Sequence, residues 1–100
     1  MNLYKVIAEQ LEAGAESITF SPKGNSMTPR ITSGQEITIH RLGADEQLET
    51  GNVVLAKVHG QYFLHKITAI SDQERYLIAN NHGRINGWTS RGKVYGKAEV

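Results

Sequence analysis

A serine and a histidine 39 positions apart are the side chains in this sequence best suited to covalent chemistry. Ser26 lies in a turn-rich stretch, Gly24–Pro29, just after the first predicted strand. A tight turn presents a hydroxyl beside free backbone amides, which a nucleophile and an oxyanion hole both need. His65 lies in a later predicted strand, and an imidazole with an ordinary pKa near 6.5 accepts a proton at neutral pH. A Gly-x-Ser sequence alone is common, so an ordinary loop serine is the alternative.

Strand geometry limits which basic side chain can face Ser26. Side chains alternate between the two faces of a strand, so His65 and the adjacent Lys66 must point in opposite directions. A lysine has to be desolvated before it loses its proton, and its pKa must fall by several units. The sequence therefore favours His65 as the general base, with Lys66 as the alternative. A histidine that is simply packed in the strand is the non-catalytic interpretation.

Other kinds of chemistry find little support. The chain has no cysteine, so disulfides, thiolate metal sites and a cysteine nucleophile are excluded. Its four histidines lack the short spacing of a metal site, and we expect no bound metal. Glycine-rich phosphate-binding motifs are also absent, so no cofactor is predicted. The aromatic residues are scattered and are interpreted as packing residues.

Length and composition predict one globular domain, residues 1–100. Hydrophobic residues make up 39% and charged residues 21% of the chain, and the net charge is +1 with both signs interspersed. The sequence contains no basic stripe of the kind that binds phosphate, so a nucleic-acid partner is not expected. The longest apolar run, Val53–Ala56, is far below the roughly 20 residues of a membrane span, and the N-terminus does not resemble a secretory signal. We therefore expect a cytoplasmic protein without a membrane span; its oligomeric state stays open.

The hydrophobic pattern predicts a mainly β fold with one N-terminal helix. Apolar residues recur at helical spacing over residues 2–13, and Gly14 follows as a stop signal. After it the spacing approaches two, with turn residues between the segments. His59-Gly60 indicates a tight hairpin. These segments predict a small β barrel or sandwich of short strands: residues 17–20, 36–40, 53–58, 62–70, 75–79 and 93–100.

The order and spacing of five short segments resemble the LexA-like and type I signal peptidase superfamily of serine peptidases. The segments are Gly24-Asn25-Ser26-Met27-Thr28-Pro29-Arg30-Ile31, Ser33-Gly34-Gln35-Glu36-Ile37, Gly51-Asn52-Val53-Val54, Leu64-His65-Lys66-Ile67 and Val94-Tyr95-Gly96-Lys97. The resemblance covers about four fifths of the chain. Each segment is weak by itself, but together they form a fairly specific pattern.

The resemblance implies that Ser26 attacks a peptide carbonyl and that the base lies about 40 residues downstream. Most members carry lysine as the base, whereas signal peptidases of the endoplasmic reticulum type carry histidine followed by arginine. His65-Lys66 is similar to this second arrangement. The oxyanion hole is expected at the amides of the Gly24–Met27 turn, formed by Gly24, Asn25, Ser26 and Met27, with Ser26 itself the first choice.

The sequence departs from the family where an acid would orient the histidine. Residues 80–88 hold no acid, although an asparagine oxygen such as that of Asn81 can accept an imidazole N–H; a turn role for Asn80 or Asn81 is the alternative. The resemblance also implies a possible self-cleavage site, which in this family is an Ala-Gly or Cys-Gly pair. Ala13-Gly14 has these letters, but it ends the predicted helix only 12 residues before Ser26, so we do not expect self-cleavage there.

The resemblance indicates a bacterial or phage serine endopeptidase that acts on a protein or peptide substrate. A catalytically weak or inactive module with the same fold, which binds a peptide or a LexA-like regulator, is the alternative.

Overall fold

The computed structural model describes residues 2–22 and 31–100. Helix α1 (Leu3–Glu12) begins at Asn2, whose side-chain oxygen accepts hydrogen bonds from the backbone N–H groups of Tyr4 and Lys5 at 3.1 and 3.3 Å. The helix ends at Ala13, and Gly14 follows with a positive φ of 118°. The helix predicted from the hydrophobic spacing is confirmed.

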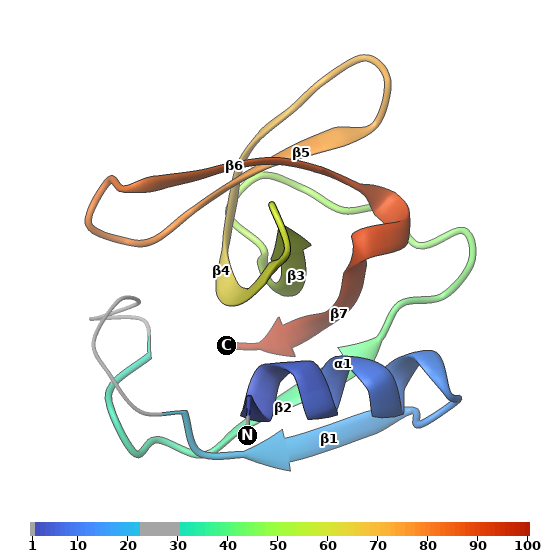
Figure 1. The fold of residues 1–100 in the computed structure, drawn as a ribbon, viewed down its shortest axis with the longest axis vertical. Coiled ribbons are helices and arrows are strands. Elements are labelled where there is room, and N and C mark those ends of the chain that lie inside the picture. Colours follow the sequence, from blue (N-terminus) through green and yellow to red (C-terminus); the bar gives the residue numbers. More distant parts are fainter. Residues whose placement is uncertain (1, 23–30) are drawn as a thin grey trace.

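The described residues form seven strands in one antiparallel sheet, with α1 lying against it (Figure 1). The order across the sheet is β1-β2-β7-β3-β4-β5-β6. In this part of the chain the two outer strands, β1 and β6, do not pair with each other, so the sheet is not closed into a barrel. The mainly β class with one N-terminal helix is confirmed. The strands are β1 (Ser17–Phe20), β2 (Ile37–Arg41), β3 (Val53–Val58), β4 (Gln61–Ile70), β5 (Arg75–Ala79), β6 (Ile85–Ser90) and β7 (Val94–Glu99), with a 3-10 turn η1 (Arg91–Lys93) before the last.

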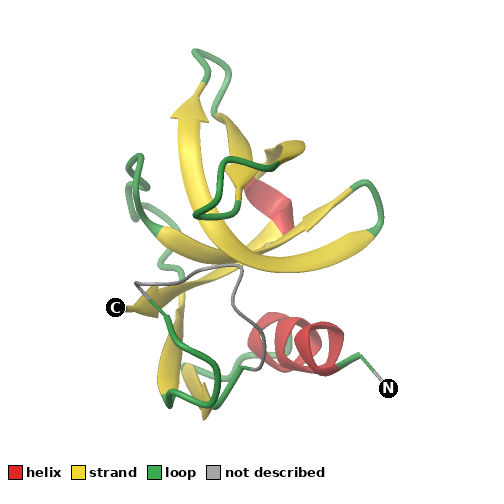
Figure 2. Cartoon of the chain, turned by 90° about the vertical axis from the view of Figure 1, so that its left-hand side faces the viewer, coloured by secondary structure: helices red, strands yellow, loops and turns green. Residues whose placement is uncertain are grey.

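Strand β3 is buried on both of its faces. Val53 and Leu55 point into a first core shared with α1, while Val54, Ala56 and Val58 point into a second core. The rest of the second core is formed by Ile67, Tyr76 and Ile78 from β4 and β5, with Leu48 and Val94. Figure 2 shows the strongly curved strands on the side of the molecule away from α1. Burial on both faces explains why β3 reads as an unbroken apolar run rather than an alternating one.

A tight hairpin joins β3 to β4 as the sequence predicts. Val58 and Gln61 are cross-strand partners, so the loop is the two-residue His59-Gly60. Both residues have positive φ, 49° and 81°, which matches the twist of the flanking strands. The turn between β5 and β6 is organised by Asn80, whose side-chain oxygen accepts the N–H groups of His82 and Arg84 at 2.8 and 2.9 Å. Asn80 is thus a turn residue.

Strand β6 was not predicted from the sequence. Its pairing with β5 contains a β-bulge: Ile78 pairs with Gly87 and Ala79 pairs with Ile85, so Asn86 between them has no partner in the ladder. Gly87 has a φ of 136°, which side-chain-bearing residues rarely adopt. The extra residue breaks the period of two that identifies a strand in sequence.

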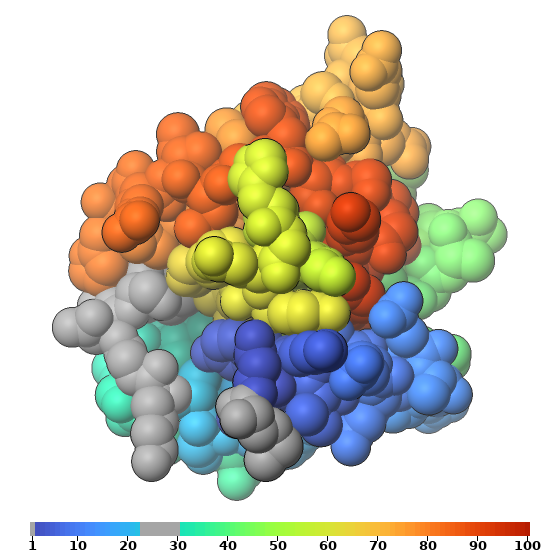
Figure 3. Space-filling view, in the orientation of Figure 1, coloured from blue at the N-terminus to red at the C-terminus, as the bar shows by residue number. Residues whose placement is uncertain are grey.

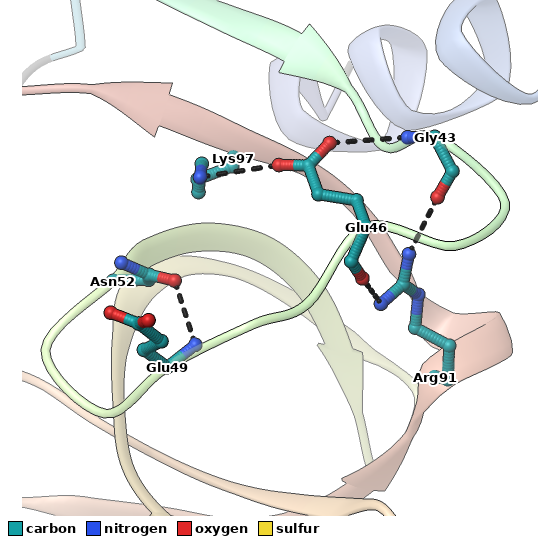
Figure 4. Close-up of polar contacts among 6 residues, drawn as sticks. All are labelled: Gly43, Glu46, Glu49, Asn52, Arg91 and Lys97. Atoms are coloured by element: carbon teal, nitrogen blue, oxygen red, sulfur yellow. Dashed lines mark hydrogen bonds and ion pairs between the residues drawn. The ribbon is translucent and has the colours of Figure 1, made fainter.

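The segment between β2 and β3 is held against the sheet by side-chain contacts to backbone (Figure 4). The Arg91 guanidinium donates to the carbonyl oxygens of Glu46 and Gly43 at 2.7 and 2.9 Å. The Glu46 carboxylate accepts from the Gly43 N–H at 3.2 Å and pairs with Lys97 at 3.1 Å. The Gly43 hydrogen bond, followed by that of Lys97, lowers the pKa of Glu46. This segment is therefore an anchored loop.

Gly96 in β7 offers a test of this packing. A Cβ atom there would lie 2.5 Å from Ile39 Cγ2 and 2.8 Å from the carbonyl oxygen of His40, so something must shift. We expect Gly96→Ala to lower the free energy of unfolding by about 1–3 kcal/mol because the core is overpacked. The matched control is Gly92→Ala, where no atom lies within 4 Å. Urea denaturation measures both, and equal midpoints for the two variants would contradict the described packing.

Candidate active site

His65 lies near the middle of β4 and is almost fully buried, with 8% of its surface exposed. Its cross-strand partner in β3 is Val54, which belongs to the second core. The ring of Phe63, two residues earlier on the same face, stacks on the imidazole with centroids 5.2 Å apart and planes 26° from parallel. The imidazole is therefore held at the margin of a packed apolar region, with a side chain fixed by its neighbours.

Asn86 fixes the orientation of this imidazole. Nδ1 of His65 and the side-chain oxygen of Asn86 lie 2.6 Å apart. An amide oxygen can only accept, so Nδ1 donates its hydrogen and Nε2 is the basic nitrogen of the neutral ring. This is the tautomer that a general base requires when its orienting partner sits on Nδ1.

The β-bulge explains how Asn86 reaches His65. In the sheet order β5 lies between β4 and β6, so the two residues come from strands that are not direct neighbours. Asn86 is the unpaired residue of the bulge, and a bulge redirects the side chain of the extra residue. Local backbone geometry in β6 thus supplies the orienting group for a side chain on β4.

Burial lowers the pKa of His65 below its ordinary value of 6.5, because the charged imidazolium loses solvation. The hydrogen bond to Asn86 acts in the opposite direction and raises the pKa by a smaller amount, since the acceptor stabilises the protonated ring. His65 is consequently neutral at pH 7. A neutral imidazole with a defined tautomer can accept a proton from a hydroxyl.

Lys66 lies on the other face of β4. Its cross-strand partners are Val53 in β3 and Ala79 in β5, and Val53 belongs to the first core. The alternation inferred from the sequence is confirmed, and the two candidate bases cannot face the same point. Lys66 is half-buried.

The proposed nucleophile and oxyanion-hole residues lie outside the described residues, because the structure does not describe residues 23–30. The pairing of Ser26 with His65 stays a prediction. The described chain is well anchored on both sides of that segment. Pro22 is buried and its carbonyl oxygen accepts the Gly34 N–H at 2.9 Å, and Ile31 is buried in the first core.

Sequence reasoning named Asn81 as a residue able to orient the histidine, whereas the oxygen on Nδ1 is that of Asn86. Asn81 lies in the turn between β5 and β6. The signal for Asn86 in the sequence is its place in Asn86-Gly87: a glycine directly after a polar residue inside a strand is typical of a bulge.

The sequence profile of the Peptidase S24-like family matches residues 3–88. This chain belongs to that family. The matched range contains Ser26, His65 and Asn86, and it supports a peptidase-fold module of the LexA and signal peptidase-like superfamily. Comparison with curated protein sequences finds no match.

Two further findings concern the described part of this S24-like chain. Residues 2–22 and 31–100 contain no group of three His, Cys, Asp or Glu side chains arranged to hold a metal ion. None of the helices in these ranges has the length and apolar character needed to cross a membrane.

The environment of His65 makes a prediction that NMR can check. In a titration of the imidazole Cε1–H signals, His65 should protonate below pH 6.5. The folded state should also lose stability as the pH falls below about 6.5, because the unfolded chain then binds the proton more readily. Asn86→Ala should lower the pKa of His65 further. Asn86→Asp should raise it, because a carboxylate stabilises the imidazolium. A His65 pKa that both substitutions leave unchanged would contradict the assigned hydrogen bond.

Proposed function

We propose that this chain is a serine endopeptidase in which Ser26 is the nucleophile, His65 the general base and Asn86 the residue that orients the base. The observation that carries the proposal is the buried, neutral His65 whose Nδ1 is bound by Asn86 at 2.6 Å. The family match and the Gly-x-Ser-Met sequence at Ser26 support the nucleophile.

In the proposed reaction, Nε2 of His65 accepts the proton of Ser26 Oγ while the oxygen attacks the peptide carbonyl. The amide of Ser26, with a neighbouring amide of Gly24–Met27, binds the oxyanion of the tetrahedral intermediate. The imidazolium then returns the proton to the leaving amine, and the carbon–nitrogen bond breaks to leave an ester on Ser26. Water then attacks that ester while Nε2 of His65 accepts its proton, and the imidazolium returns the proton to Ser26 Oγ. This step releases the acid product and restores Ser26 and His65.

The sheet offers a mode of substrate recognition. Strands β1 and β6 are the outer strands of the described sheet, β1 precedes residues 23–30 in the chain, and β6 carries Asn86. An extended peptide that adds to an outer strand gains main-chain hydrogen bonds without dependence on its sequence. A protein or peptide substrate that adds to β6 would lie beside the strand that carries Asn86, the partner of His65.

One observation favours a second candidate function, a peptide-binding module with little turnover. The partner of His65 is a neutral amide, which stabilises the developing imidazolium less than a carboxylate does. The same fold and edge strands would then hold a peptide or a LexA-like regulator without cleavage.

Labelling with a serine-reactive fluorophosphonate, read by intact mass, distinguishes the two functions. For the enzyme we expect one adduct, on Ser26, that Ser26→Ala abolishes. His65→Ala should slow labelling by about 100-fold or more, the usual contribution of a general base. Lys66→Ala is the matched control on the opposite face and should change the rate little. Absence of labelling in the native chain across a range of phosphonates would instead support the binding module.

The pH dependence of labelling tests the identity of the base. The rate should rise with pH through a pKa below 6.5 and then level off, because His65 is a base only in its neutral form. Asn86→Ala should move this rise to lower pH and reduce the plateau. A rise that begins only above about pH 7 to 8 would indicate Lys66 as the base, since tuned lysines titrate there.

A further inference from the structure

A hollow of about 230 Å³ lies between the β3–β4 hairpin, β6 and η1. His65 is not among the residues that line it. Figure 3 shows the yellow-green β3–β4 hairpin against the orange and red surface that includes β6 and η1. We call it the β6 pocket.

The wall of the β6 pocket is built by specific contacts between β3 and β6. Thr89 is buried and its hydroxyl donates to the carbonyl oxygen of Lys57 at 2.6 Å. The ring of His59 lies directly over Gly87, with its Nε2 2.8 Å from the position a Cβ would occupy. The hairpin tip and β6 are therefore fixed relative to each other, and the pocket between them has a defined shape.

The lining of the pocket is positively charged. Arg75 and Ser90 are direct cross-strand partners, and Lys93 follows in η1 three residues after Ser90. No carboxylate lines the pocket, and in the described residues neither Arg75 nor Lys93 forms an ion pair. Lys57 also lines the pocket and adds a third positively charged side chain, whose ammonium group lies 5.3 Å from the centre of the Tyr62 ring.

An exposed aromatic ring borders these charges. Trp88 lies two residues before Ser90, which puts both side chains on the same face of β6, and 42% of the Trp88 surface is exposed. Stacking on such a ring is worth about 1–3 kcal/mol per nucleobase and does not depend on the base. Guanidinium and ammonium groups beside it are the groups that bind phosphate.

We propose that the β6 pocket binds a nucleotide unit, with its phosphate at Arg75 and Lys93 and its base on Trp88. This inference is independent of the peptidase activity proposed above. The sequence did not predict it because Arg75, Trp88 and Lys93 are separated along the chain by residues of other kinds and form no basic stripe. The pairing of β5 with β6 and the turn η1 bring them together.

The test uses Trp88, the only tryptophan of the chain, as its own reporter. Adenosine monophosphate should quench its fluorescence in a saturable manner, with a dissociation constant of about 1 mM or below. Arg75→Ala and Lys93→Ala should each weaken binding by about fivefold or more, as expected for loss of a charge-assisted contact. Lys5→Ala removes the same charge from α1, away from the pocket, and should leave binding unchanged.

Further ligands separate the sources of the nucleotide and the alternatives. If short oligothymidylate binds more tightly than thymidine monophosphate, the proposal is supported and the ligand is a nucleic-acid single strand. If the two bind with equal affinity, the proposal is supported and the ligand is a free nucleotide. The proposal would be overturned if inorganic phosphate or an acidic peptide quenched Trp88 fluorescence while nucleotides did not. Quenching that persists in the Arg75→Ala/Lys93→Ala double variant would also overturn it. Ser26→Ala should bind as the native chain does, so a failed peptidase proposal leaves this result intact.

Discussion

Strand β3 must bury side chains on both faces, and the rest of the fold follows from that constraint. Val53–Val58 supplies the centre of two cores, and burial of each Val or Leu side chain is worth about 1.5–3 kcal/mol. Helix α1 covers one face and the curled strands β4 and β5 cover the other. Because the two-residue hairpin fixes the register of β4 on β3, the burial of Val54 also fixes the position of His65 opposite it.

The contact between His65 and Asn86 contributes more to geometry than to stability. A hydrogen bond between neutral groups is worth about 1 kcal/mol net, whereas a buried polar group left without a partner costs about 1–3 kcal/mol. The bulge in β6 leaves Asn86 outside the ladder, and a glycine within a strand costs about 0.5–1 kcal/mol in backbone entropy. This bulge brings Asn86 to Nδ1 of His65 and leaves Nε2 as the basic nitrogen, an arrangement that a general base requires.

The sequence predicts those parts of the fold that depend on local patterns. The helix, the hairpin at His59-Gly60 and the opposite faces of His65 and Lys66 follow from spacing and turn residues, and the structure confirms them. Strand β6 could not be predicted in this way because its bulge interrupts the alternation. Asn86 could be recognised as the partner of His65 only once the strand order was known. The contact crosses β5, which lies between β4 and β6, and it depends on the shift of register in the β5–β6 pairing.

An asparagine at this position has a chemical consequence that separates it from an aspartate. A carboxylate would raise the pKa of the buried imidazole and stabilise the imidazolium, but it would also place a second charge in a region of low polarity, at a desolvation cost. The amide gives the same hydrogen-bond direction without that charge, so the low pKa set by burial is retained. As the proposed general base, His65 would then be neutral over a wide pH range but weak, and its proton acceptance would depend more heavily on how well the oxyanion is stabilised. In the proposed site the backbone amides of residues 24–27, rather than the partner of the histidine, would carry most of the transition-state stabilisation.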